Sequence, residues 1–137
     1  MKEKKINNLL IYLFFFIYFI IGFSIYKDYG IGIEEHFQRQ NGFYWLQKIL
    51  SSLKINDLSF LALEKYQEIR SYDPSLPDPN FFNFYGIAFD VPTAFFEIIF
   101  ELNNSKSYFE IRHLFNFFFF FISSIFFYKI LKTRFKD

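Results

Sequence analysis

Two long apolar runs constrain how this chain can fold more than any other feature. Leu9–Tyr26 contains no charged residue, and Leu114–Tyr128 consists almost entirely of Phe, Ile and Leu. A helix over the first run is about 27 Å long at about 1.5 Å per residue, which is close to the hydrocarbon thickness of a bilayer. The sequence therefore predicts two transmembrane helices, over residues 9–26 and 113–131.

The first apolar run also has the features of a signal peptide, because a basic head of residues 1–8 precedes it. However, the run is longer than a usual signal core. No small-residue cleavage site follows it, and Gly22-Phe-Ser24 is a poor substitute. We therefore interpret the run as a transmembrane helix.

Composition excludes several functional classes. The 137 residues have room for one domain at most, and the absence of cysteine excludes disulfides, thiolate metal sites and cysteine nucleophiles. The formal net charge of +1 predicts no nucleic-acid binding. The 25 Phe residues partly reflect AT-rich codons, so we do not interpret the Phe tracts as a binding feature.

Residues 27–112 are predicted to form a helical loop between the two spans. Gly30 and Gly32 favour a turn after the first span. Helical spacing of apolar residues then predicts helices near 34–53 and 57–70, the second capped by Asn56 or Asp57. The predicted apolar faces are Leu46, Ile49, Leu50 and Leu53 on the first helix, and Leu58, Leu61, Ala62 and Ile69 on the second.

The second half of this loop begins with a break in helical structure. Three prolines in residues 71–80 exclude helix, and residues 85–102 then predict an amphipathic helix with Pro92 near its start. We expect this helix to pack on the other helices or to lie on the membrane surface. Ser107 to Glu110 matches a capping box and predicts the start of the helix that contains the second span.

Basic residues predict the orientation in the membrane. The ends of the chain, including the tail at 132–137, carry Lys and Arg, whereas residues 27–112 hold eight Lys or Arg against twelve Asp or Glu. By the positive-inside rule, both termini are cytoplasmic and the loop is periplasmic or extracellular. The predicted fold class is thus an all-α membrane protein with two transmembrane helices flanking an external loop of two or three amphipathic helices.

Two adjacent carboxylates, Glu34 and Glu35, follow the first span closely. A carboxylate can serve as a general base, so the pair is a candidate catalytic site. A structural role is also open, because the first turn of a helix favours acidic residues and Arg39 lies four residues after Glu35. We favour Glu34 as the base, with Glu35 bound to Arg39 or to a metal.

Four segments of the chain are similar to the N-terminal part of GT-C class membrane glycosyltransferases. They are Asp28-Tyr-Gly-Ile-Gly-Ile-Glu-Glu35, Gln38-Arg-Gln-Asn-Gly42, Tyr85-Gly-Ile-Ala-Phe-Asp90 and Arg112-His-Leu114. The resemblance covers most of this chain but only a small part of such an enzyme, which has many spans. It implies that the chain is the N-terminal piece of an enzyme and is inactive alone.

The resemblance also implies a chemistry. Enzymes of this class transfer a sugar from a polyprenyl-phosphate carrier at the non-cytoplasmic face of the membrane. A carboxylate in the first external loop acts as general base on the acceptor hydroxyl. The family's pair is usually Asp-Asp, Asp-Glu or Glu-Asp, so Glu34-Glu35 departs from it by one methylene group at one or both positions.

Three further residues are candidates for binding the substrate. Arg39 and Arg112 could hold a lipid-linked phosphate, because guanidinium matches phosphate oxygens in a two-pronged way, or they could contact ordinary lipid headgroups. Asp90 could face the same cleft as the glutamates or solvate its own helix. A divalent cation between Glu34 and Asp90 is conceivable, but no spacing of His and carboxylate residues predicts a metal site.

A second hypothesis belongs to a different functional class. The chain could be a small two-span membrane protein that binds a partner subunit, since the apolar faces Leu46/Ile49/Leu50/Leu53 and Phe95/Phe96/Ile99 need something to cover them. Membrane lipid is a partner under either hypothesis. The missing C-terminal spans are a partner under the first.

Overall fold

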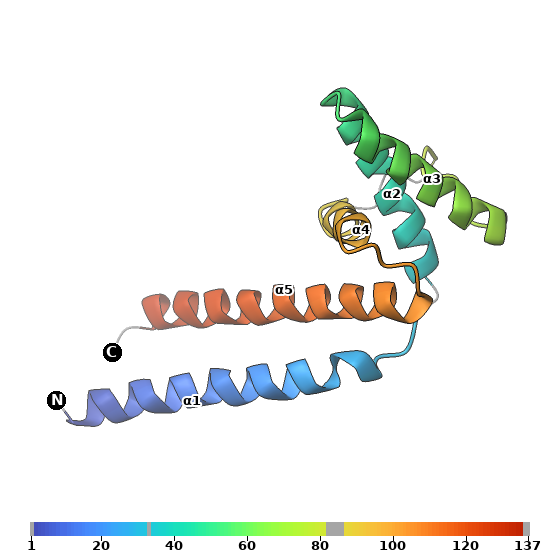
Figure 1. The fold of residues 1–137 in the computed structure, drawn as a ribbon. Helices are drawn as coiled ribbons and strands as arrows, with labels where there is room; N and C mark the ends of the chain where they lie inside the picture. The colour runs from blue at the N-terminus through green and yellow to red at the C-terminus, as the bar shows by residue number, and fades with distance from the viewer. Residues whose placement is uncertain (1, 33, 82–86, 136–137) are drawn as a thin grey trace. The chain divides into compact units, whose positions relative to one another are not determined.

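The computed structural model describes residues 2–32, 34–81 and 87–135, all of them in helices or in the connections between helices (Figure 1). The elements are α1 (Lys2–Ile25), the short 3₁₀ helix η1 (Tyr26–Asp28), α2 (Glu35–Ser52), α3 (Asn56–Tyr72), α4 (Asp90–Ile99) and α5 (Ser105–Arg134). No strand occurs among these described residues. The predicted all-α class is confirmed to this extent.

The chain divides into two compact units. One unit comprises residues 1–29 and 110–137, and the other comprises residues 30–109. We call the first the two-helix unit, because α1 and most of α5 form it. We call the second the three-helix unit, because it contains α2, α3 and α4.

Both helices of the two-helix unit are long and apolar enough to cross a membrane. The apolar segments are Ile6–Asp28 and Ser105–Arg134. The two helices run antiparallel, so that the first turn of α1 and the last turn of α5 lie at the same end of the pair (Figure 1). Aromatic rings fill the space between them; the ring of Phe19, for example, lies 5.3 Å from that of Phe121.

The three-helix unit is built on a hairpin of α2 and α3, and α4 packs against α2. Its core consists of apolar side chains from all three helices: Phe43, Leu46, Leu50, Ala62, Ile69 and Ala94. Helices α2 and α4 approach each other closely at Gly42, where an added Cβ would lie 2.5 Å from the carbonyl oxygen of Asp90. A side chain at this position would therefore push the two helices apart.

The bounds of α2 and α3 lie close to the predicted ones, but details of both helices differ. Leu46 and Leu50 are buried as predicted, whereas Ile49 and Leu53 are exposed, because the core also receives Phe43 and turns the buried face of α2 away from them. Leu61 of α3 is likewise exposed. The residue that precedes α3 is Ile55, which makes no capping hydrogen bond, so the predicted cap at Asn56 or Asp57 is wrong.

Helix α4 is shorter than the predicted helix at 85–102. Residues 85 and 86 lie outside the described residues, and the helix spans Asp90–Ile99 with Pro92 in its first turn. A proline fits there because the first turn has no intrahelical acceptor for its N–H. The helix packs on α2 and α3, which is one of its two expected placements, and Asp90 and Glu97 are buried.

Helix α5 begins two residues before the predicted capping box. The side-chain Oδ1 of Asn104 accepts the backbone N–H of Lys106 at 2.9 Å, so Asn104 caps the helix that starts at Ser105. Ser107 lies inside the first turn, which corrects the prediction. An Asn side chain satisfies a free N–H of the first turn as well as a Ser side chain does, so the sequence offered two caps and the structure uses the earlier one.

Candidate functional site

The two adjacent glutamates lie at the start of α2 and have different surroundings. Glu34 is the residue before the helix, and its side chain is exposed and makes no capping bond. Glu35 is partly buried, and its Oε1 accepts the backbone N–H of Gly32 at 2.8 Å. Because Glu35 also donates its own N–H to the Gly32 carbonyl at 3.1 Å, this side chain helps close the turn into α2. Glu34 is therefore the more exposed carboxylate of the pair.

Arg39 is not paired with Glu35, which corrects the local pairing that the sequence predicted. Its Nε donates to both carboxylate oxygens of Glu97, at 3.1 and 3.0 Å, and its Nη2 donates to Oε1 at 2.5 Å. The side chains of this ion pair are only 8% and 2% exposed. The guanidinium also lies 3.8 Å from the centre of the Tyr108 ring. Arg39 is thus held rigidly between α4 and the first turn of α5.

Asp90 is buried at the start of α4, where its Oδ2 accepts the side-chain N–H of Asn41 at 3.2 Å. Asn41 follows Glu34 by seven residues, so Asp90 lies about 10 Å along the α2 axis from the glutamate. The structure therefore does not place Glu34 and Asp90 at one cation, and this interpretation of Asp90 is wrong. Among the described residues, no three His, Asp or Glu side chains are grouped so as to hold a metal ion.

Arg112 lies in α5 and belongs to the two-helix unit. The other four candidate residues lie in the three-helix unit or at its edge. Arg112 is buried, as is His113, whose ring meets the ring of Tyr29 edge-on at 5.8 Å. The candidate site is therefore described from the three-helix unit alone.

Sequence reasoning missed a buried polar layer between α2 and α4. Arg39 and Asn41 of α2 are buried and bond to buried Glu97 and Asp90 of α4, and Thr93 of α4 is also buried. A signal for it was present, because the polar residues of α4 recur at spacings of three and four and so form one helix face. Buried charges are tolerated when they are paired and hydrogen-bonded. Arg39 and Glu97 meet this condition.

A cavity of about 420 Å³ opens beside Arg39 in the three-helix unit. It is lined by side chains from three separate stretches of the chain: His36, Arg39, Lys65, Glu68, Ile69, Tyr72, Asp73, Leu76, Asn103, Ser105 and Tyr108. Lys65 Nζ bridges Glu68 Oε2 and Asn103 Oδ1, each at 3.1 Å. No sequence motif revealed the cavity, because its walls meet only when α2, α3 and the start of α5 pack together.

The chemistry of this cavity suits a polar ligand. Its walls offer positively charged hydrogen-bond donors, carboxylates, an imidazole and hydroxyl groups. Together these groups can hydrogen-bond a sugar or a phosphorylated group. His36 of α2 lines the cavity, whereas Glu34 and Glu35 are not among its lining residues. The candidate functional site therefore has two parts, the cavity and the exposed Glu34 before α2.

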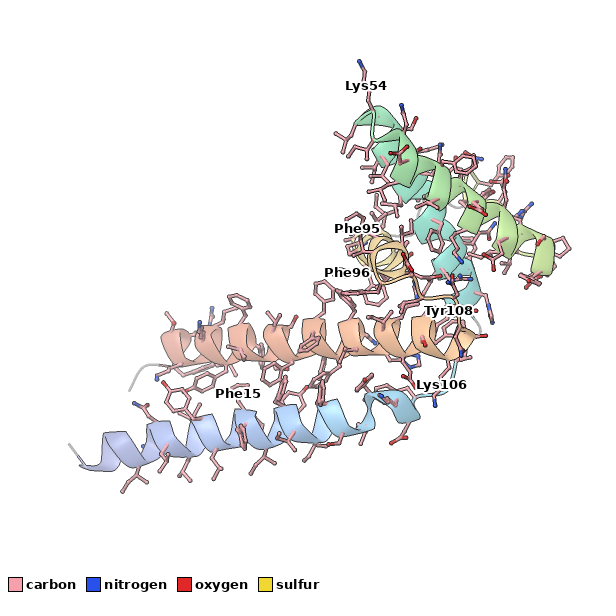
Figure 2. All side chains as sticks on the ribbon, in the orientation of Figure 1. Phe15, Lys54, Phe95, Phe96, Lys106 and Tyr108 are labelled. Atoms are coloured by element: carbon pink, nitrogen blue, oxygen red, sulfur yellow. The ribbon has the colours of Figure 1, made fainter. Side chains whose placement is uncertain are left out.

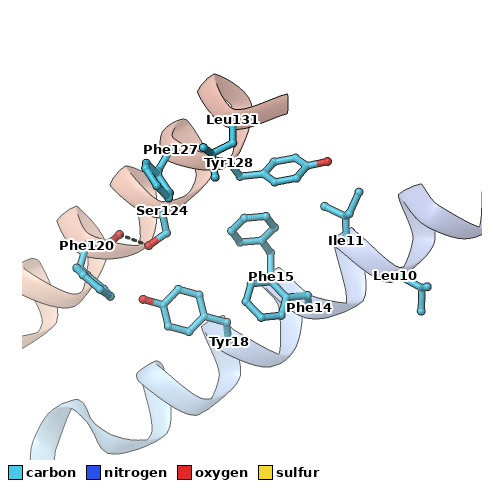
Figure 3. A pocket seen from close by; sticks show the side chains of 10 residues that line it. All are labelled: Leu10, Ile11, Phe14, Phe15, Tyr18, Phe120, Ser124, Phe127, Tyr128 and Leu131. Carbon is cyan, nitrogen blue, oxygen red and sulfur yellow. Dashed lines mark hydrogen bonds between the residues drawn. The ribbon is translucent and has the colours of Figure 1, made fainter. Parts of the chain in front are cut away.

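A second cavity of about 560 Å³ lies between α1 and α5 (Figure 3). Its walls are apolar apart from the hydroxyls of Tyr18, Ser124 and Tyr128, and the Ser124 hydroxyl donates to the Phe120 carbonyl at 2.9 Å. A hydroxyl on an apolar helix often uses such a carbonyl in place of water. In a bilayer this groove suits lipid chains rather than a polar substrate.

Comparisons with protein-family models, with curated proteins and with solved structures found no match to this chain.

Proposed function

We propose that this chain is the N-terminal part of a membrane glycosyltransferase of the GT-C class. In this proposal α1 and α5 cross the membrane, both termini are cytoplasmic, and residues 30–109 face the periplasm or the cell exterior. The chain would act together with further spans, because two helices cannot enclose a polyprenyl chain. The donor is a sugar on polyprenyl phosphate and the acceptor carries a hydroxyl group.

The observation that carries this proposal is that the two glutamates differ in their contacts and exposure. Glu35 is engaged with the backbone of Gly32 and so holds the turn, whereas Glu34 is exposed on the next residue. A base must reach the proton that it removes while its backbone stays in place. Glu34 meets both requirements, since it directly precedes a helix that buried contacts hold against α4.

Glu34 would act as general base in a single displacement. Its carboxylate takes the proton of the acceptor hydroxyl, while the hydroxyl oxygen forms a bond to the anomeric carbon of the sugar. The bond between that carbon and the phosphate oxygen breaks, and polyprenyl phosphate leaves with the electron pair. The polar cavity beside His36 and Arg39 would hold the sugar or its phosphate.

The test compares two matched substitutions, Glu34→Gln and Glu35→Gln, within the full coding region that contains this chain. Transfer of labelled sugar from polyprenyl phosphate is measured in membranes. Loss of a general base lowers the rate by about 10²–10⁴-fold, so we expect this loss for Glu34→Gln at unchanged protein level. Glu35→Gln should lose far less, because a Gln side chain can still accept the Gly32 N–H. Unchanged transfer by Glu34→Gln would refute the role of Glu34.

A second function is favoured by exposed apolar side chains at the end of α4. Ile99 and Phe100 are exposed there, on the surface of the three-helix unit. A two-span membrane protein that binds a partner subunit through this surface would explain them. The coding sequence after codon 137 separates the two functions, because further hydrophobic spans support the enzyme and an intergenic region supports the partner-binding protein.

A further inference from the structure

The end of the α2–α3 hairpin exposes several large apolar side chains. Ile49 is 38% exposed, Leu53 64%, Ile55 42% and Phe60 66%. We call these four residues the hairpin tip. Leu61, next to Phe60, is also exposed, at 42%, and Tyr72 at the opposite end of α3 is 82% exposed. Between these two residues the exposed side chains of α3 are polar, as at Glu64 and Gln67. A polar stretch thus separates the apolar end of the hairpin from Tyr72.

The backbone of the tip is suited to leave water. The N–H groups of three consecutive turn residues are satisfied within the hairpin: Leu53 donates to Ile49 at 3.0 Å, Lys54 to Ser51 at 3.0 Å and Ile55 to Leu50 at 2.9 Å. Unsatisfied backbone groups are the main barrier to placing a turn in a lipid environment. Because these three N–H groups are already hydrogen-bonded, they add no such cost when the turn enters lipid.

Lys54 occupies the turn in a left-handed conformation, with φ of 60°. Glycine is the residue that this position of a helix end favours, because it has no Cβ to strain the backbone. The lysine instead places an ammonium group at the end of the hairpin (Figure 2). A second lysine, Lys48, directly precedes Ile49, and its amine lies over the Tyr44 ring at 4.3 Å. The end of the hairpin thus carries the four apolar side chains together with the Lys54 ammonium and the Asp57 carboxylate, and the Lys48 amine lies farther back along α2.

The connections of the three-helix unit place a lipid surface within reach of the tip. Gly30 lies two residues after the apolar segment Ile6–Asp28, and Ser105 begins the second apolar segment. Helix α2 has 18 residues and is about 27 Å long. The tip lies only one helix length from residues that adjoin both spans, so it can meet the surface of the same bilayer when the hairpin lies along it.

We infer that the hairpin tip inserts into the lipid surface of the membrane that holds α1 and α5, and that it prefers anionic lipid. With the hairpin lying along the surface, its exposed apolar side chains can enter the interface to the depth of about 5–10 Å at which interfacial helices bury theirs. Lys48 and Lys54 can extend their amines to lipid phosphates. The inference requires insertion of the spans and does not depend on glycosyl transfer.

The test uses the absence of cysteine from the chain, which allows one spin label at a time. The full chain is reconstituted in bilayers, and Ile55→Cys carries the label whose collisions with oxygen and with a water-soluble nickel complex are measured. We expect the ratio of oxygen to nickel accessibility to shift toward the lipid value, and to shift further in phosphatidylglycerol than in phosphatidylcholine. Gln67→Cys is the matched control on α3 and should give the value of a label in water.

Each other outcome overturns the inference. A label at Ile55→Cys that behaves like the one at Gln67→Cys means that the tip stays in water. An immobile label that neither reagent reaches means that protein covers the tip, and dilution with unlabelled chain shows whether that protein is a second copy. A third label, at Phe16→Cys in the middle of the first span, separates these results from a failure of insertion, in which it too would be reached by nickel.

Discussion

The buried ion pair between Arg39 and Glu97 makes a sharp prediction about the three-helix unit. Glu97→Gln keeps the shape of the side chain but removes its charge, and leaves the guanidinium buried. The remaining amide oxygen accepts one N–H, while the new amide nitrogen faces another donor. We expect this variant to lower the free energy of unfolding of the three-helix unit, because the pair links α2 to α4.

The expected loss follows from the burial of the pair. With side chains only 8% and 2% exposed, neither charge has water as an alternative partner. Breaking such a pair by removing one member costs about 3–5 kcal/mol. The exposed pair of Lys65 with Glu68, at 24% and 42%, provides a matched control, and Glu68→Gln should cost at most about 1 kcal/mol.

The assay uses Trp45, the only tryptophan of the chain, which lies in α2. Its fluorescence follows urea unfolding of the three-helix unit in detergent micelles. With a slope of about 1–3 kcal/mol per M urea, a loss of 3–5 kcal/mol lowers the midpoint by at least about 1 M. The double variant Arg39→Met/Glu97→Leu should recover most of the loss, because replacing both members by apolar residues removes the uncompensated charge.

Two results would refute this reasoning. A midpoint for Glu97→Gln that equals the midpoint for the Glu68→Gln control would mean that the pair is solvated in solution. A double variant that loses as much stability as Arg39→Met alone and Glu97→Leu alone added together would mean that the residues act independently.

Two further predictions concern helix packing and capping. Gly42→Ala should lower the urea midpoint, because overpacking against the Asp90 carbonyl costs about 1–3 kcal/mol and the better helix propensity of Ala returns only about 1 kcal/mol. Gly30→Ala is the control, since no atom lies within 4 Å of its added Cβ, and it should leave the midpoint unchanged. Equal midpoints for the two variants would contradict the close approach at Gly42. Asn104→Ala should cost about 1 kcal/mol at the start of α5 and speed hydrogen exchange of its first-turn amides, and unchanged exchange would argue against the cap.

Much of the candidate site could be predicted from local sequence, and the rest depended on partners far along the chain. The carboxylate pair at the start of a helix was predictable, because the apolar run ends just before it and helical periodicity begins just after it. The cavity beside Arg39 was not, since its walls come from residues 36–39, 65–76 and 103–108. No spacing within one segment encodes which other segment packs against it.

Local sequence was enough to predict the positions of α2 and α3 and the two helices that are apolar enough to span a membrane. These properties follow from runs and periods of side chains within one segment, and the bounds of α2 and α3 agree closely with that pattern. The pairing of charges and the covering of apolar residues depended instead on how the helices pack. Arg39 selects Glu97, 58 residues away, over Glu35 one turn before it, because packing of α4 on α2 removes water from Arg39 and leaves a buried carboxylate as its partner.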